Sequence, residues 1–335
     1  MRPMNASAAD RRVIGIDLGG TKLAAGVVGG DLTVHHRATR SSRGLSQEAV
    51  VELIVDVVEE LRQQAGGDVP VEAVGLGIPS LIDQKSGSAV MSVNLDIANL
   101  PIRDVMTERL GLPIALDNDG NVAALVEQRF GAGRGMHTII SLGLGTGISG
   151  GIIITGKLFR GATGSGAELG HVTVVEGGLP CQGNCPNLGC LETMCSGNAI
   201  GRYANEFASE NPDSALGTEL ASGRPVTGVT VNELAAAGDQ DAIAILAKAG
   251  RYLGAGLVGI TNTFNPQAVV IGGGAGAAAG EFILGPAREH LRRYGLKPNN
   301  EIAQLVPAHF GADAGMLGSA VMAFVECLDE PLEED

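Results

Sequence analysis

The sequence predicts an α/β protein built from two related halves. Each half opens with two apolar runs joined by a Gly-rich turn, and helical patterns follow these runs. The two turns, at residues 16–21 (IDLGGT) and 142–147 (LGLGTG), form a weak internal echo of one another. The chain has 335 residues, enough for about two domains. We therefore expect two strand–turn–strand units, each offering a turn that can hold phosphate.

The first half contains strands and helices in alternation. Short apolar runs predict strands at 12–18, 23–28 and 34–39. Apolar residues at helical spacing predict a helix at 47–65, which ends at Gly66-Gly67. The remaining expected elements are a strand at 71–78, a helix at 102–110, a strand at 113–116 and a helix at 121–130.

The second half repeats the opening and then becomes mainly helical. Strands at 138–143 and 151–155 flank its Gly-rich turn. A long helix at 239–263 is expected to be broken or loosened by Gly254, Gly256 and Gly259. The other expected elements are helices at 192–208, 281–293 and 313–327, a strand at 268–271 and a disordered acidic tail at 329–335.

Composition excludes several classes of protein. The net charge of −14 and the 3% aromatic content, without Trp, argue against a nucleic-acid-binding surface. The first eleven residues lack the apolar run of a secretory signal. Two uncharged stretches, 135–156 and 252–280, are interrupted by Gly, Asn and Pro, so neither predicts a membrane span. We therefore expect a soluble cytoplasmic protein with neither nucleic-acid nor membrane partners.

The turn at residues 15–22 (GIDLGGTK) is a candidate phosphate site. It nearly matches a P-loop, but a strand follows where a P-loop opens a helix. Glycines still let backbone N–H groups approach a phosphate, and Asp17 could hold Mg²⁺. An ordinary hairpin turn remains the alternative.

A second Gly-rich segment, residues 272–277, follows a strand and precedes a helix. It fits the dinucleotide fingerprint, but no clear acidic strand end follows about 20 residues later. A nucleotide lying against the start of the helix is therefore favoured over an NAD site.

Asp117-Asn118-Asp119-Gly120 lies at the carboxyl end of a predicted strand, where α/β sheets place ligands. Asn and Asp are also common N-caps of helices. The two roles are compatible, since one residue can cap the helix while another faces a ligand.

The residues His171, Cys181, Cys185 and Cys190 form a Cys₃His set within 20 positions. This donor set is typical of a structural zinc site, and the Gly and Pro between the ligands allow tight turns. Five cysteines, an odd number, do not suit a disulfide framework. Three free thiols in a loop, or a catalytic Cys, are the alternatives.

Taken together, these segments resemble the ROK family of sugar kinases, and bacterial glucokinases within it. The resemblance runs from about residue 13 to 325. Its motifs are DLGGTK at 17–22, DNDGNVAAL at 117–125, LGLGTGISGG at 142–151, GAELGH at 166–171, GCLE at 189–192 and GGG at 272–274. Each motif is weak alone, but their order is highly specific.

The resemblance implies a two-lobe, actin-like (ribonuclease-H-like) α/β fold with a cleft between the lobes. The small lobe is expected at 1–119 plus 312–335, and the large lobe, with the zinc loop, at 120–311. It further implies ATP-dependent phosphorylation of a hexose at its 6-hydroxyl, most readily glucose, by a homo-oligomer (dimer or tetramer).

The resemblance also assigns roles to residues. Asp119 matches the catalytic base, and His171 with Cys181, Cys185 and Cys190 matches a structural Zn²⁺ site. The sugar ligands are Asn94, Asn118, Asp119, Glu168, His171 and Glu192. The residues that match the ATP site, with Mg²⁺ near Asp17, are Asp17, Gly19, Gly20, Thr21, Lys22, Gly145, Thr146, Gly147, Gly272, Gly273 and Gly274.

This chain departs from the family pattern at three places. Three residues separate Cys181 from Cys185, where the family usually has one. Pro79-Ser80 replaces a Pro-Gly pair, and Asn94-Leu95-Asp96-Ile97 replaces an Asn-Leu-Gly-Trp-like stretch. The last two changes lie near the expected sugar.

Other functions remain open within the family. Another hexose or an N-acyl-hexosamine could be the substrate, namely fructose, mannose, N-acetylmannosamine or N-acetylglucosamine. Polyphosphate could be the donor. A sugar sensor without catalysis is disfavoured by Asp119. A DNA-binding repressor would need a helix-turn-helix domain before the first strand near residue 12, and the charge of −14 opposes it.

Overall fold

The computed structural model describes residues 11–66, 69–92 and 95–330. These residues divide into two compact units. Unit 1 takes in the described residues up to 135, residues 151–167 and the described residues from 312 on. Unit 2 comprises residues 136–150 and 168–311.

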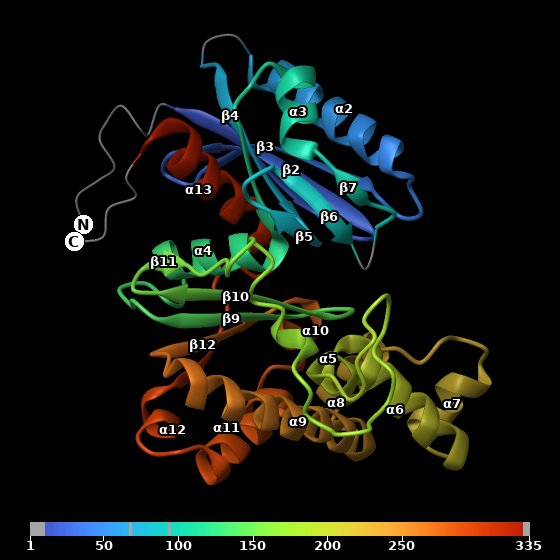
Figure 1. Cartoon of the computed structure of the whole chain (residues 1–335). Coiled ribbons are helices and arrows are strands. Elements are labelled where there is room, and N and C mark those ends of the chain that lie inside the picture. Colours follow the sequence, from blue (N-terminus) through green and yellow to red (C-terminus); the bar gives the residue numbers. More distant parts are fainter. Residues whose placement is uncertain (1–10, 67–68, 93–94, 331–335) are drawn as a thin grey trace. The chain divides into compact units, whose positions relative to one another are not determined.

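Unit 1 is built on a sheet whose strands lie in the order β3-β2-β1-β4-β8. Figure 1 labels β2, β3 and β4 of this sheet. β1 is antiparallel to β2 and parallel to β4, and β4 is parallel to β8. The sheet is thus a hairpin extended by parallel strands. The strand bounds are β1 (Arg12–Leu18), β2 (Lys22–Gly29), β3 (Val34–Ser41), β4 (Val71–Ile78) and β8 (Ile114–Asn118).

Helices pack on this sheet. α2 (Gln47–Ala65) and α3 (Ile102–Leu110) contact one another, and α13 (Ala314–Leu328) packs on β1, β4 and β8 and against α4 (Asp119–Phe130). α13 lies very close to the strands, since a Cβ added at Gly75 would be 1.8 Å from the carbonyl oxygen of Ser319. No side chain other than hydrogen fits at that position.

A smaller sheet of β5 (Ser80–Asp83), β6 (Ser88–Ser92) and β7 (Ala98–Leu100) lies in the chain between β4 and α3. These strands were not predicted from the sequence, because each is only three to five residues long.

The second sheet has the order β11-β10-β9-β12-β13. β9 and β12 are parallel, as are β12 and β13, while β10 and β11 are antiparallel. The order matches that of the first sheet, position for position. The strand bounds are β9 (Ile139–Leu144), β10 (Ile148–Ile154), β11 (Lys157–Leu158), β12 (Ala268–Gly272) and β13 (Gln304–Pro307).

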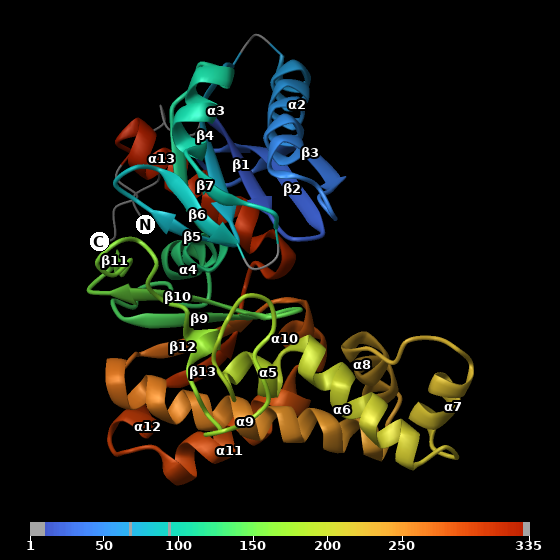
Figure 2. The ribbon, with the colours of Figure 1, turned by 45° about the vertical axis from the view of Figure 1, so that its right-hand side comes forward.

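Unit 2 carries most of the remaining helices. α9 and α11 pack side by side, as Figures 1 and 2 show. The helix bounds are α5 (Leu191–Cys195), α6 (Gly197–Glu210), α7 (Ala215–Ala221), α8 (Gly228–Ala236), α9 (Gln240–Phe264), α10 (Gly274–Ala279), α11 (Glu281–Tyr294) and α12 (Asn299–Ile302), with 3₁₀ turns η1 (Leu169–His171) and η2 (Gly311–Asp313).

Two predicted helices were wrong in detail. The helix expected at 192–208 is two helices, because Ser196 ends α5 and its side chain caps the N-terminus of α6. The helix expected to break in the 239–263 region is continuous. Its glycines serve close packing instead: a Cβ at Gly250 would lie 2.4 Å from the carbonyl oxygen of Ile283, and one at Gly254 would meet His290, both in α11.

The units differ from the predicted lobes over residues 120–135 and 151–167, which belong to unit 1. α4 explains the first difference, because a Cβ at Gly318 of α13 would be 1.9 Å from the carbonyl oxygen of Val122. The second follows from contacts of α4 with Gly151, whose Cβ would lie 2.4 Å from the carbonyl oxygen of Gly120.

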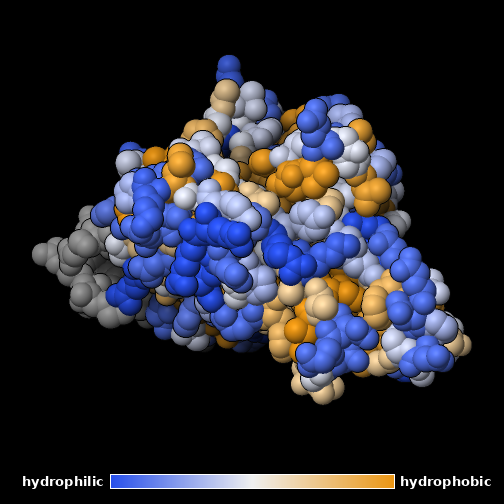
Figure 3. Space-filling model, turned by 90° about the horizontal axis from the view of Figure 1, so that it is seen from below, coloured by the Kyte–Doolittle hydropathy of each residue, from blue (hydrophilic) through white to orange (hydrophobic). Residues whose placement is uncertain are grey.

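Among the residues that the structure describes, two helices are long and apolar enough to cross a membrane by length and composition: α9 and the helical segment 311–328. Half or more of each apolar window, 50% and 56%, is buried inside the protein. Buried helices of a globular core meet the same criterion. On the face seen in Figure 3, hydrophobic groups are separated by hydrophilic ones.

Candidate functional site

The first Gly-rich turn, residues 19–22, joins β1 to β2 in unit 1. The N–H of Gly19 donates to the carbonyl of Lys22 at 2.8 Å, and the hydroxyl of buried Ser42 donates to the carbonyl of Gly19 at 2.6 Å. Ser42, which directly follows β3, therefore holds the turn in place through this hydrogen bond. The side chains of Thr21 and Lys22 are exposed.

Asp17 precedes this turn and lies against the start of α13. A Cβ added at Gly315 would be 2.4 Å from Cγ of Asp17. Burial, together with the nearby charge of Asp119, raises the pKa of Asp17 to about 7. The charge of Asp119 thus acts on the carboxyl group of Asp17 within unit 1.

Asn118 and Asp119 lie where β8 becomes α4. The side chain of Asn118 accepts from the N–H of Gly120 at 2.8 Å and so caps the helix, while its Nδ2 donates to the carbonyl of Ser80 at 3.2 Å. Oδ1 of Asp119 accepts from the same Gly120 N–H at 2.9 Å. Asn118 therefore has the structural role that the sequence allowed, and it leaves Asp119 as the group suited to chemistry.

Burial raises the pKa of Asp119 to about 6, against backbone hydrogen bonds that lower it. A carboxylate with this pKa is mostly ionised at neutral pH and is a better base than an ordinary Asp.

The second Gly-rich turn, residues 145–147, joins β9 to β10. The N–H of Gly145 donates to the carbonyl of Gly147 at 2.9 Å, and the carbonyl of Gly145 accepts from the N–H of Gly197, the first residue of α6, at 2.8 Å. Directly after the turn, the N–H of Ile148 donates to Oε2 of Glu192 at 2.7 Å. The turn and the buried carboxylate of Glu192 are therefore one hydrogen-bonded unit.

The third Gly-rich segment, residues 272–274, joins β12 to α10. Gly273 has φ of +77°, and a Cβ there would lie 2.4 Å from the carbonyl oxygen of Leu144. The segment is thus pressed against the end of β9, directly before the second turn.

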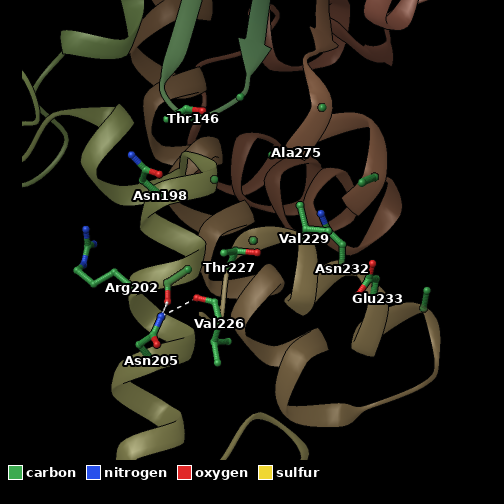
Figure 4. Close-up of a pocket in the computed structure, with 17 residues that line it drawn as sticks. Thr146, Asn198, Arg202, Asn205, Val226, Thr227, Val229, Asn232, Glu233 and Ala275 are labelled. Carbon is green, nitrogen blue, oxygen red and sulfur yellow. Dashed lines mark hydrogen bonds between the residues drawn. The ribbon is translucent and has the colours of Figure 1, made fainter. Parts of the chain in front are cut away.

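These two turns of unit 2 border a cavity of about 910 Å³ (Figure 4). The residues labelled there come from the second turn, α6, α8 with the segment before it, and α10. Oδ1 of Asn232, a residue only 9% exposed, has no hydrogen-bond partner among the described residues. The lining residues are Gly145, Thr146, Gly197, Asn198, Gly201, Arg202, Asn205, Val226, Thr227, Gly228, Val229, Asn232, Glu233, Ala236, Gly274, Ala275 and Ala278.

The size and lining of this cavity suit a small organic molecule with polar edges. Its wall is formed by glycine and small apolar residues, and a few amide and charged side chains could orient a ligand. A phosphorylated tail could extend along the two turns, where no Cβ blocks Gly145 or Gly274.

His171, Cys181, Cys185 and Cys190 come together in unit 2, with their ligand atoms within 4.8 Å of one another. Sγ of Cys181 lies 3.5 Å from Nδ1 of His171. Burial and the neighbouring thiols raise the pKa of Cys190 to about 12, so a cation is needed to hold these groups as thiolates. Donor set and spacing fit a four-coordinate zinc ion.

His171 also faces Glu168. Nε2 of His171 is 3.8 Å from Oε2 of Glu168, while Nδ1 points to the cysteines. A metal on Nδ1 would fix the orientation of the ring and the tautomer that meets the carboxylate. Sγ of Cys181 also lies 4.0 Å from Oε1 of Glu192.

The metal loop contacts the cavity wall through Gln182. Its Oε1 accepts from Nδ2 of Asn198 at 2.7 Å, and its Nε2 donates to the carbonyl of Thr146 at 3.4 Å. Gln182 lies between Cys181 and Cys185, so this segment contacts the second turn.

The structure thus groups the predicted residues within each unit. Unit 2 brings together Glu192, Gly145–Gly147 and Gly272–Gly274, and groups Glu168 with His171. Unit 1 holds Asp17, the first turn, Asn118 and Asp119. Asn94 lies outside the described residues.

The sequence did not lead us to predict α8, which forms part of the cavity wall. Thr227 and Thr230 form a capping box at its N-terminus, and this pattern could have indicated the helix. Gln182 was not predicted either, because the local sequence offers no signal for it.

Known proteins resemble this chain along most of its length. The ROK family profile matches residues 13–325. A glucokinase of Streptomyces coelicolor is 36% identical over 317 residues, which cover 92% of this chain and 96% of that protein.

Two solved structures are similar over nearly the whole chain. The ROK family glucokinase of Streptomyces griseus, solved in complex with glucose and AMPPNP, is 36% identical with a TM-score of 0.83, covering 93% of this chain and 98% of that one. The ROK hexokinase of Thermus thermophilus is 35% identical with a TM-score of 0.75, covering 95% and 99%. These similarities confirm the predicted α/β fold class, that of the two-lobe, actin-like sugar kinases.

Proposed function

Because this chain belongs to the ROK family, we propose that it transfers the terminal phosphoryl group of ATP to the 6-hydroxyl of a hexose, with glucose as the preferred substrate. One observation carries the proposal. Glu192, which matches a sugar ligand, accepts a hydrogen bond at 2.7 Å from Ile148, directly after the Gly-rich turn that borders the 910 Å³ cavity. The turn at residues 145–147 therefore connects the proposed binding site of the sugar, which accepts the phosphoryl group, with that of ATP, which donates it.

The sugar hydroxyls are bound by carboxylates, amides and an imidazole. Glu168, His171 and Glu192 accept or donate at hydroxyls in unit 2, and the carboxylates do so by charge-assisted hydrogen bonds. Asn94 and Asn118 complete the set as amide ligands. Orientation of the 6-hydroxyl is the main gain, because phosphoryl transfer depends on in-line placement.

Asp119 is the catalytic base. Its carboxylate accepts a hydrogen bond from the 6-hydroxyl and takes the proton late, as the bond to phosphorus forms. Its pKa of about 6 leaves it ionised at neutral pH and raises its basicity above that of an exposed Asp. Its hydrogen bond with Gly120 fixes the carboxylate at the start of α4.

ATP occupies the cavity of unit 2. The nucleoside lies against α6, α8 and α10, and the phosphates run along Gly145–Gly147 and Gly272–Gly274. The turn at Gly19, Gly20, Thr21 and Lys22 would contribute backbone N–H groups other than that of Gly19, which is bonded to the carbonyl of Lys22, and one positive charge. Asp17 would hold a Mg²⁺ ion directly or through water, and the ion would supply neutralisation of the phosphate charge.

A zinc ion would be held by His171, Cys181, Cys185 and Cys190 and would have a structural role, since all four positions are filled by protein. The site fixes the ring of His171, and Cys190 is followed two residues later by Glu192. The loop therefore carries two sugar ligands.

We also propose a cytoplasmic homo-oligomer, either a dimer or a tetramer. Four free thiols lie outside α13, and three of them belong to the metal loop. A reducing compartment such as the cytoplasm keeps these thiols from forming disulfides. ATP and hexoses are available there as well.

A coupled assay of ADP release tests the function. Glucose, mannose, fructose, N-acetylglucosamine and N-acetylmannosamine are compared with ATP as donor, and polyphosphate replaces ATP in a parallel series. We expect glucose with ATP to give the highest kcat/KM. A higher kcat/KM with an N-acyl-hexosamine would make that sugar, rather than glucose, the preferred substrate. No turnover with any sugar would favour a sugar sensor without catalysis.

A further inference from the structure

The strand that leads to the proposed base carries a fully buried carboxylate. Asp117 lies in β8, two residues before Asp119, and its exposure is 0%. Its Oδ1 accepts from the N–H of Asn118 at 2.7 Å and from Nδ2 of Asn121 at 2.8 Å. These bonds tie β8 to the first turn of α4 through one side chain.

The other oxygen of Asp117 meets a cation from a distant part of the chain. Nε of Arg160 donates to Oδ2 of Asp117 at 2.5 Å, and Nη2 of Arg160 donates to Glu326 of α13 at 2.5 Å. The side chain of Asp117 is inaccessible, whereas those of Arg160 and Glu326 are 28% and 35% exposed. The buried end of this network is the Asp117–Arg160 pair.

The segment that carries Arg160 is itself anchored to unit 1. The carbonyl of Thr163 accepts from the N–H of Gln84 at 3.2 Å, and Nε2 of Gln84 donates to the carbonyl of Leu116 at 3.0 Å. A Cβ at Gly164 would lie 2.3 Å from the carbonyl oxygen of Ile82, so the backbones are in close contact. Arg160 is thus held in place before it meets Asp117.

A buried carboxylate needs such a partner. Removing the cation leaves an uncompensated buried charge, and the site must relax by moving the group toward water or by protonating it. Either response changes the hydrogen bonds of Asp117 to Asn118 and Asn121, which flank Asp119. A small displacement there is costly, since a misplacement of about 1 Å can reduce a rate about 100-fold.

We infer that Arg160 is a positioning residue for phosphoryl transfer: its ion pair with Asp117 sets the backbone of residues 117–121 and so the carboxylate of Asp119. This inference rests on the proposed function of Asp119. Arg160 need not touch sugar or nucleotide, so it should act on kcat more than on either binding constant.

Three variants test the inference. Arg160→Met removes the charge and keeps much of the apolar stem, Arg160→Lys keeps the charge without the planar fork, and Glu326→Gln removes the exposed partner only. We expect kcat of Arg160→Met to fall about 10- to 100-fold. Affinity for a non-hydrolysable ATP analogue should stay within about two-fold, since the nucleotide contacts residues of unit 2. Glucose KM should change less than kcat, because Glu168, His171 and Glu192 still bind the sugar.

The conservative variants supply the controls. Arg160→Lys should recover part of the lost kcat, because an ammonium can still pair with Asp117. Glu326→Gln should remain within about two-fold of wild type, as exposed ion pairs contribute little. The double variant Asp117→Asn/Arg160→Met removes both charges and should be more stable to heat than Arg160→Met alone, which reports the pair independently of turnover.

The outcomes separate this inference from the proposed function. An active wild type whose Arg160→Met variant keeps its kcat would overturn the inference alone, as would equal losses in kcat, glucose binding and analogue binding. If Arg160→Met does not fold, the double variant Asp117→Asn/Arg160→Met, which lacks the ion pair without leaving a buried charge, takes its place, and a kcat equal to that of wild type overturns the inference. A wild type that phosphorylates no hexose overturns the proposed function and the inference with it.

Discussion

The two sheets share a strand order, but their Gly-rich turns have different surroundings. The turn at 19–22 in unit 1 lies near two carboxyl groups, Asp17 and Asp119, whose pKa values are both raised. The turn at 145–147 in unit 2 borders a large cavity. The carboxylate next to this turn, that of Glu192, is hydrogen-bonded to the backbone N–H of Ile148.

The difference arises from what each half inserts between its repeated strands. Unit 1 inserts the small sheet β5–β7, whereas unit 2 inserts the metal loop and helices α5–α8 between β11 and α9. α6 and α8 form much of the cavity wall. The repeated scaffold thus places a turn, and the insertions decide what the turn can bind.

The largest expected effect concerns the carboxylates of unit 1. Asp119→Asn should lower kcat by about 100- to 10,000-fold, because the 6-hydroxyl loses its base. Glucose affinity and thermal stability should be retained, since the amide can replace the hydrogen bond to Gly120. Steady-state kinetics and sugar titration measure this, with Asp31→Asn in the exposed β2–β3 turn as the control. A kcat within a few-fold of wild type would remove Asp119 from the mechanism.

The next effect concerns the metal loop of unit 2. Cys190→Ser should abolish zinc binding, lower kcat by about 100-fold and raise glucose KM, because Glu192 and His171 lose their support. Affinity for the ATP analogue should fall less, through the contact of Gln182 with Thr146.

Elemental analysis and paired titrations of sugar and ATP analogue check this prediction. Cys195→Ala is the matched control, since Cys195 is buried in α5 outside the metal cluster. Equal loss for both ligands would indicate general unfolding. Normal zinc content in Cys190→Ser would refute the ligand set.

A smaller effect separates two neighbouring glycines of unit 2. Gly273→Ala should cost about 1–3 kcal/mol and weaken the ATP analogue, because φ is +77° and the new Cβ meets the backbone of Leu144. Gly274→Ala is the control for stability alone and should change the free energy of unfolding by no more than about 0.5 kcal/mol, since no atom lies within 4 Å of its added Cβ. Thermal unfolding compares the two variants, and analogue titration is made on Gly273→Ala against wild type. Equal behaviour would show that the close contact with β9 is unimportant.

The smallest effect concerns the pH dependence of stability in unit 1. The pKa of Asp17 is about 7, above the ordinary value of 3.8, so the unfolded chain ionises first as pH rises. Stability from this group is therefore present below about pH 4 and lost by about pH 7. Asp17→Asn should raise Tm by a few °C, roughly, at pH 8 and hardly at pH 4, measured without Mg²⁺ or ATP. A gain that is equal at both pH values would exclude ionisation of Asp17 as the cause.

Much of the fold could be predicted because its elements have local signals. The strand at Arg12–Leu18 and the helices Gln47–Ala65 and Ile102–Leu110 have the predicted bounds. The missed strands β5–β7, β11 and β13 are two to five residues long, too short for periodicity to detect. The candidate metal ligands also carried a local signal, since Cys₃His spacing is recognisable without a fold.

The sequence by itself determined the alternation of elements, the two related Gly-rich turns and the family, because these depend on residue order and local spacing. Only the tertiary structure decided that Gly250 and Gly254 pack helices rather than break one, that Gln182 reaches Thr146, and that Arg160 neutralises Asp117 43 positions away. Such contacts are set by the packing of distant segments, where burial makes an unpaired charge or an added methyl group costly, and no local pattern records them.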